Sequence, residues 1–165
     1  MTLDEFNILD REQARDVVRP CVDVVRWIDA VVDARPYSTV RDLLTVARET
    51  ASPWTLAEID GALAHHPRIG ERARGAHPEA SLSRSEQAAI DPDDAQVAAA
   101  LADGNRAYEQ RFGRVFLIRA ARRTPGEILE ELQRRMTNSV EQEIPVVAEQ
   151  LREIAVLRLE GILSS

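Results

Sequence analysis

Apolar side chains recur at steps of three and four residues through most of this 165-residue chain. This spacing places them on one face of an α-helix, whereas a half-buried strand would alternate apolar and polar residues. The sequence contains no alternating strand pattern and no Asn-Gly hairpin signal. It therefore predicts an all-α fold without a sheet, a single-domain bundle of about seven or eight helices over residues 1–165.

Capping motifs and prolines divide the helical pattern into segments. A capping box pairs a threonine or serine with a glutamate three residues later, and the two side chains bind the first free backbone N–H groups. Such motifs begin at Thr55, Ser83 and Thr124, and Ser38 is the expected cap of an earlier helix. The predicted helices run over about 13–32, from Ser38 to Ser52, from Thr55 to the His65-His66-Pro67 stretch, from Ser83 after an irregular loop over 72–82, from Asp91-Pro92 to Gly113, from Thr124 to Met136, and over 140–163.

Shorter features lie among the later helices. The apolar run 115–118 is too short to assign by periodicity, and we expect it to be extended and buried between helices. Asn105 and Tyr108 share a helix face, which predicts core packing with a hydrogen-bonded tyrosine hydroxyl. The basic pairs 122–123 and 134–135 are predicted to lie on solvated faces.

Charge and composition exclude several function classes. The 28 acidic and 21 basic residues give a formal net charge of −7, which argues against general nucleic-acid binding. The single cysteine, Cys21, excludes an internal disulfide and fits a reduced, cytoplasmic setting. No apolar run approaches the length of a membrane span, and the first residues lack the pattern of a signal peptide.

His66 is the first candidate for chemistry. Pro67 follows it directly and disfavours helical geometry at His66, so the preceding helix should end there. Gly70 then permits a turn. An imidazole at a helix end can exchange a proton near neutral pH, since its unperturbed pKa is about 6.5. The simpler alternative is a histidine that binds the last helical carbonyl groups.

A metal site is a less favoured interpretation of the same stretch. It would use His65, His66, His77 and Glu71. Adjacent histidines on a helix point about 100° apart, so one ion could not easily bind both. The His-x-x-x-His spacing is also absent. The sequence therefore predicts no metal site.

The motif Ser83-x-x-Glu86-Gln87 is the second candidate. As a capping box it has a purely structural explanation. If it opens a helix, however, Glu86 and Gln87 lie in the first turn beside backbone donors that favour negatively charged ligands. Both uses could share one helix start.

Arg158 is the third candidate because it interrupts an apolar stripe. On the last predicted helix, Leu151, Ile154 and Ile162 share its face, so the guanidinium occupies a core-facing position. Such a group can extend to solvent, pair with a protein carboxylate, or bind the carboxylate of a ligand through two parallel hydrogen bonds.

Four motifs in register resemble the OHCU decarboxylases, that is, the 2-oxo-4-hydroxy-4-carboxy-5-ureidoimidazoline decarboxylases. Each motif alone is weak, but their order and spacing match along nearly the whole chain, and Trp27 and Arg35-Pro36-Tyr37 match near the start. Arg68-Ile69 differs from the Asp-Leu of animal members and is similar to the bacterial branch. The motifs are His66-Pro67-Arg68-Ile69-Gly70, Ser83-x-x-Glu86-Gln87, Asn105-x-x-Tyr108-x-x-x-Phe112-Gly113-x-x-Phe116 and the late Arg158.

The resemblance implies an all-helical carboxy-lyase that needs no cofactor, commonly forms homodimers and catalyses the last step from urate to (S)-allantoin. It implies that His66 is the catalytic acid/base, with Glu86 beside it as a second catalytic residue. Residues implied to bind the substrate are Pro67, Ser83, Gln87, Phe116, Leu117, Ile118, Arg119, Ala120 and Arg158, the segment 116–120 through its backbone. The alternatives are a helical interaction module without catalysis and a metal-dependent hydrolase.

Overall fold

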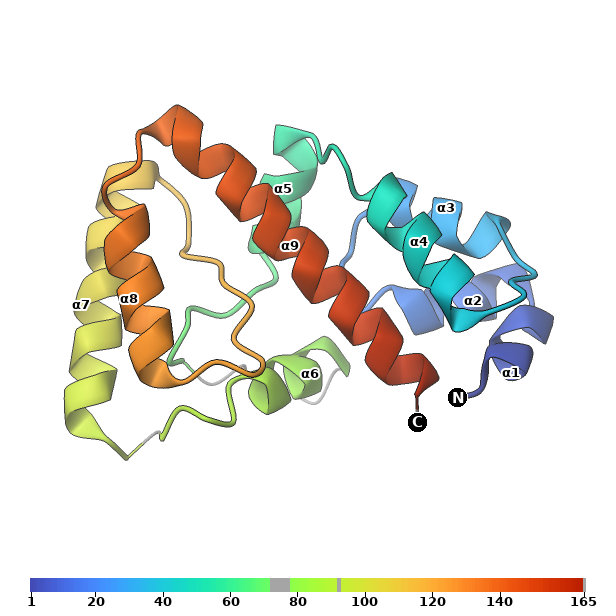
Figure 1. Ribbon diagram of the computed structural model, residues 1–165, viewed down its shortest axis with the longest axis horizontal. Coiled ribbons are helices and arrows are strands. Elements are labelled where there is room, and N and C mark those ends of the chain that lie inside the picture. Colours follow the sequence, from blue (N-terminus) through green and yellow to red (C-terminus); the bar gives the residue numbers. More distant parts are fainter. Residues whose placement is uncertain (72–77, 92, 165) are drawn as a thin grey trace. The chain divides into compact units, whose positions relative to one another are not determined.

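The computed structural model describes residues 1–71, 78–91 and 93–164, and within these ranges it contains helices and no strand. The predicted all-α class is therefore confirmed. The described residues form nine helices (Figure 1), somewhat more than predicted. These are α1 (Leu3–Ile8), α2 (Arg11–Val18), α3 (Val25–Asp33), α4 (Val40–Thr50), α5 (Leu56–Leu63), α6 (Pro78–Glu86), α7 (Ala95–Phe112), α8 (Pro125–Arg135) and α9 (Val140–Leu163).

The chain folds into two compact units. One comprises Met1–Ala62 together with Arg152–Ser165, and the other comprises Leu63–Leu151. Each unit has its own buried core, so each is described separately below. The single domain expected from the sequence remains a prediction.

The N-terminal helices differ from the single helix predicted over 13–32. The chain forms α2 and α3 instead, because Pro20 cannot donate the hydrogen bond that a continuous helix requires. Val24 is extended and precedes the first residue of α3. Helices α1 and α2 begin at capping boxes formed by Thr2 and Asp10, and neither helix start was predicted from the sequence.

The core of this unit centres on Trp27. The indole is fully buried, and its Nε1 donates to the Ala47 carbonyl in α4 at 2.9 Å. The cap of α4 is Thr39, whose hydroxyl accepts from the Asp42 N–H, so the cap predicted at Ser38 was wrong by one residue. Capping depends on which hydroxyl faces the helix end, which the sequence left open between these neighbours.

Helix α5 begins at the predicted capping box. Thr55 Oγ1 accepts from the Glu58 N–H at 3.1 Å, and Glu58 Oε2 accepts from the Thr55 N–H at 2.9 Å. Arg26 on α3 donates to both oxygens of the same carboxylate, at 2.6 and 3.0 Å. These bonds, first of all the one from Arg26, lower the pKa of Glu58.

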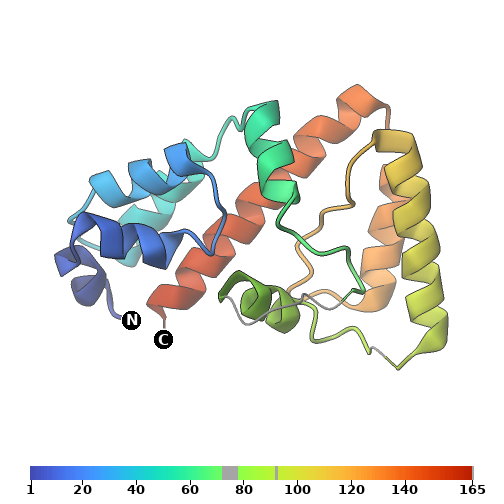
Figure 2. The same cartoon turned by 180° about the vertical axis from the view of Figure 1, so that it is seen from behind.

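The second unit is built around α7 and α8, which lie side by side in both ribbon views (Figures 1 and 2). Gly104 permits the close approach, since a Cβ at that position would lie 2.6 Å from a methyl carbon of Leu132. Gly113 ends α7 with a φ of 68°, as its position in the sequence predicted. The Tyr108 ring contacts two other aromatic rings, with its centroid 4.6 Å from that of Phe112 and 5.2 Å from that of Phe116.

Two predicted helix starts in this unit were wrong. Helix α6 begins at Pro78, so 78–82 are helical and not part of a loop, while the rest of that predicted loop, 72–77, lies outside the described residues. Helix α7 begins at Ala95 and not at Asp91-Pro92. Its cap is Asp94, whose carboxylate accepts from two N–H groups at 3.1 Å, and Pro92 lies outside the described residues.

Three of the later predictions are confirmed: the burial of the run 115–118, the start of α8 and the bounds of α9. The run 115–118 has no regular secondary structure, and its side chains are mostly buried. Helix α8 begins at the Thr124 capping box. Helix α9 covers Val140–Leu163 as predicted, with Pro145 in its early turns. In the part of the chain that the structure describes, no helix is long and apolar enough to span a membrane.

The lowered pKa of Glu58 predicts an acid-dependent loss of stability. Because folding favours the ionised carboxylate, its contribution is present above the unfolded pKa of about 4.3 and is lost as the pH falls through the folded pKa. Glu58→Gln should therefore lower the unfolding free energy by about 1 kcal/mol or less at pH 7, and by much less at pH 3. Urea unfolding at both pH values measures this, and a difference independent of pH would contradict it.

Candidate functional site

His66 follows the end of α5, as Pro67 predicted. Its backbone N–H donates to the Leu63 carbonyl at 3.2 Å, which closes the last turn. The side chain is half-buried, and its Nε2 atom is inaccessible to solvent. The imidazole is thus held on the segment His66 to Glu71, which we call the His66 loop.

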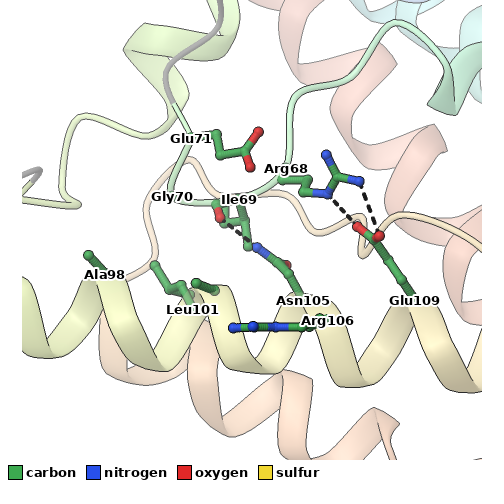
Figure 3. Close-up of a pocket in the computed structure, with 10 residues that line it drawn as sticks. Arg68, Ile69, Gly70, Glu71, Ala98, Leu101, Asn105, Arg106 and Glu109 are labelled. Carbon is green, nitrogen blue, oxygen red and sulfur yellow. Dashed lines mark hydrogen bonds and ion pairs between the residues drawn. The ribbon is translucent and has the colours of Figure 1, made fainter.

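Three side chains from other segments bind the His66 loop (Figure 3 shows two of them). Asn105 Nδ2 on α7 donates to the Ile69 carbonyl at 2.9 Å. Arg68 donates to both carboxylate oxygens of Glu109, at 2.5 and 3.1 Å. The third contact is the Gly70 N–H, which donates to Gln87 Oε1 at 2.8 Å. Backbone and side chain of the loop are therefore both bound.

Gly70 gives the loop its turn. Its φ of +87° lies in the left-handed region, which a residue with a Cβ rarely adopts. A Cβ there would also lie 3.0 Å from Leu101 Cδ1 on α7. The sequence prediction of a glycine-dependent turn after His66 is thus confirmed.

The predicted helix start at Ser83 was wrong, and the correction changes the chemistry of this segment. Ser83 lies inside α6 and Glu86 is its last residue, while the Gln87 N–H still donates to the Ser83 carbonyl at 3.2 Å. This end of the helix presents carbonyl groups, so the expected backbone donors for an anionic ligand are not at Glu86 and Gln87. Ser83 is buried, and Glu86 and Gln87 are half-buried.

The segment 116–120 is anchored from two helices. The Leu117 carbonyl accepts from Arg135 Nη1 at 2.7 Å, and the Arg119 N–H donates to Gln150 Oε1 at 2.9 Å. Phe116, Leu117, Ile118 and Ala120 are buried, and Arg119 is half-buried. Two of the backbone groups that could bind a ligand are therefore already used within the protein.

Arg135 is the main residue that the sequence analysis misplaced. It is fully buried, where a solvated face was predicted, and its Nε donates to Glu143 Oε1 at 2.6 Å. The Tyr108 hydroxyl donates to the same oxygen at 2.6 Å, and Asn138 donates to the other oxygen at 2.9 Å. Burial, followed by the bond to Glu143, raises the pKa of Tyr108. Every charged or polar group in this cluster thus has a partner.

A signal for this cluster was present in the sequence. Arg135 follows Ile128 and Leu132 at spacings of seven and three residues, which places it on the buried face of α8. Its neighbour Arg134 points outward and pairs with Glu131. Helical periodicity could have distinguished the two arginines.

Arg158 is buried, as its place in the apolar stripe predicted. Its Nη1 donates to the Pro20 and Cys21 carbonyls at 3.2 and 3.3 Å. It belongs to the unit of Met1–Ala62 and Arg152–Ser165, whereas the other predicted site residues belong to Leu63–Leu151. Its grouping with His66 remains a prediction.

A pocket of about 350 Å³ lies between the His66 loop and α7. Figure 3 shows the loop above the helix, with Arg68 and Glu109 at one end of the pocket and Ala98 at the other. None of the predicted site residues lines it. The lining residues are Arg68, Ile69, Gly70, Glu71, Ala98, Leu101, Ala102, Asn105, Arg106 and Glu109.

The structure describes three of the four residues in the metal-site hypothesis. His77, one of its four members, lies outside the described residues. Among the residues that are described, no three His, Cys, Asp or Glu side chains gather closely enough to hold an ion.

Comparison with known proteins identifies the family. The OHCU decarboxylase family model matches residues 7–160. The chain is also 32% identical over 166 residues to the 2-oxo-4-hydroxy-4-carboxy-5-ureidoimidazoline decarboxylase of Amia calva, an alignment that covers 99% of this chain and 95% of that protein. The chain belongs to the OHCU decarboxylase family. The resemblance stated from the motifs is confirmed, and both names agree with the predicted enzyme class, a decarboxylase.

Solved structures share the fold of this OHCU decarboxylase family member. A crystal structure of OHCU decarboxylase in the presence of (S)-allantoin superposes with a TM-score of 0.72 at 24% identity, covering 91% of this chain and 99% of that one. A crystal structure of (S)-allantoin synthase superposes with a TM-score of 0.70 at 15% identity, covering 99% of this chain and 54% of that one. At these identities the likeness concerns the fold.

Two adjacent arginines provide a matched test of the buried cluster. Glu143→Gln leaves the buried Arg135 guanidinium without its carboxylate and should lower the unfolding free energy by about 3–5 kcal/mol. Glu131→Gln removes the partner of the exposed Arg134 and should cost about 1 kcal/mol or less. Urea unfolding of both variants measures the difference. Similar losses for the two would show that the buried pair has no special role.

Proposed function

We propose that this protein decarboxylates 2-oxo-4-hydroxy-4-carboxy-5-ureidoimidazoline to (S)-allantoin, the last step of urate degradation, without a cofactor. The observation that carries the proposal is the near full-length match to a relative named for this substrate. The family model supports it over residues 7–160. The fixed His66 loop supplies a site consistent with the reaction.

The reaction itself makes modest demands on the protein. The bond between the ring carbon and its carboxylate breaks, and the electron pair remains on that carbon. The neighbouring ring C=N group and carbonyl can accept this charge, so the substrate supplies its own electron sink. The protein must hold the ring in one orientation and deliver a proton to one face, which are effects of positioning and of general acid catalysis.

His66 is the proposed acid/base. An imidazole can donate or accept a proton near neutral pH at little cost. The bound loop supports this role, since a general acid must stay within hydrogen-bond reach of the reacting group. Glu86 is the second proposed catalytic residue, and it lies at the end of α6, next to the Gln87 side chain that holds Gly70.

The remaining residues are proposed to bind the substrate. Gln87 can offer its amide NH₂ to acceptor groups, because its Oε1 already accepts from Gly70. Arg158 is proposed to bind the carboxylate, for which a guanidinium has matching geometry. Pro67, Ser83 and the segment Phe116, Leu117, Ile118, Arg119 and Ala120 are proposed to line the site. We also propose that the protein is cytoplasmic and acts as a homodimer.

The direct test couples the protein to substrate made in place. Urate is treated with urate oxidase and the hydrolase that acts next, and the purified protein is then added. We expect optically active allantoin to form faster when the protein is present. Prior dialysis of the protein against a metal chelator should leave this rate unchanged. An unchanged rate of substrate decay with folded protein would reject the function, and loss of activity on chelation would reject cofactor independence.

Replacement of the imidazole tests its role. His66→Gln keeps a polar side chain but cannot carry a proton near neutral pH, so kcat should fall by roughly 10²- to 10⁴-fold. Circular dichroism of the variant controls for folding. Wild-type kcat/KM in the folded variant would exclude His66 as the acid/base.

A further inference from the structure

Asn105 occupies a position in the core that an apolar residue would ordinarily fill. On α7 it lies on the stripe of Leu101, Tyr108 and Phe112, and only 4% of its surface is exposed. Its side-chain Nδ2 donates a hydrogen bond to the Ile69 carbonyl in the His66 loop at 2.9 Å. The amide is therefore directed at the third residue after His66.

Keeping an amide at this position costs stability. Among the described residues, none donates a hydrogen bond to Asn105 Oδ1, which is buried. A buried acceptor without a partner lowers the stability of the folded protein, because it loses its hydrogen bond to water. The bond to the loop is the evident compensation, because it satisfies the carbonyl of Ile69, itself a buried residue.

Glu109 reinforces the same contact one turn further along α7. Its carboxylate receives two parallel hydrogen bonds from the Arg68 guanidinium, a geometry that fixes orientation as well as distance. Asn105 and Glu109 thus hold adjacent loop residues, Ile69 and Arg68, from one rigid helix. Neither side chain needs to touch the substrate to fix where His66 lies.

We infer that Asn105 and Glu109 are positioning residues that act on catalysis through the His66 loop. The inference rests on the proposed role of His66. A displacement of about 1 Å at a catalytic group can cost as much as 10²-fold in rate. Loosening the loop should therefore lower kcat while leaving KM nearly unchanged, because Pro67 is the one residue of the loop among those proposed to bind the substrate.

The experiment compares two alanine substitutions on α7 that break exposed ion pairs. Glu109→Ala breaks the pair with Arg68 in the loop, and Asp103→Ala breaks the pair with Arg106, which stays within the helix. Alanine suits a helix, so both variants should fold. We expect kcat to fall about fivefold or more in Glu109→Ala and by less than twofold in Asp103→Ala, with KM unchanged. Equal effects would overturn the inference.

Asn105→Ala removes the hydrogen bond to the Ile69 carbonyl. We expect kcat per folded molecule to be about tenfold or more below that of the wild type. A purely structural role would instead lower the melting temperature and leave kcat per folded molecule unchanged.

NMR provides a second test that needs no substrate. The resonances of the His66 imidazole, assigned by their loss in His66→Gln, report the geometry of the loop. His66 resonances should shift in Glu109→Ala and Asn105→Ala but not in Asp103→Ala. Unshifted resonances would refute the positioning role whether or not the wild type is active. An inactive wild type would, by itself, refute only the proposed function.

Discussion

The unit of Leu63–Leu151 depends on one buried ion pair, between Arg135 and Glu143. Transferring two charges from water to a protein interior is costly, and the cost is recovered only when each has further partners. Here Tyr108, Asn138 and the Leu117 carbonyl complete the set. The pair thereby joins α7, α8, the start of α9 and the segment 116–120, so the segment proposed to line the site is fixed by the same interaction that organises the core.

The His66 loop follows the same principle with weaker contacts. It has little regular structure, and it is bound by Gln87, by Asn105 and through the Arg68–Glu109 pair. Pro67 and Gly70 restrict the backbone locally, and the side chains from α7 and the end of α6 fix what remains free. A reactive group on a loop becomes useful when rigid helices hold that loop, which is the arrangement found here.

Sequence reasoning succeeded where the deciding forces are local. The Thr55 and Thr124 caps, the glycine end of α7 and the bounds of α9 depend on neighbouring residues only, and all were predicted. It failed where a local pattern has two readings. Ser83-x-x-Glu86 has the form of a helix start but ends α6, and the stripe predicted as one helix over 13–32 is divided after Val18.

By itself, the sequence determined the all-helical class, the family, and the position of an imidazole at the end of a helix. Periodicity, capping and motif order depend only on residue types and their spacing along the chain. Only the tertiary structure decided that Arg135 is buried, that Gln87 binds the Gly70 N–H and that Asn105 binds the Ile69 carbonyl. These contacts join residues 17 and 36 positions apart. A buried charge or amide is stable only with its partner, and which distant group becomes that partner is set by how the helices pack.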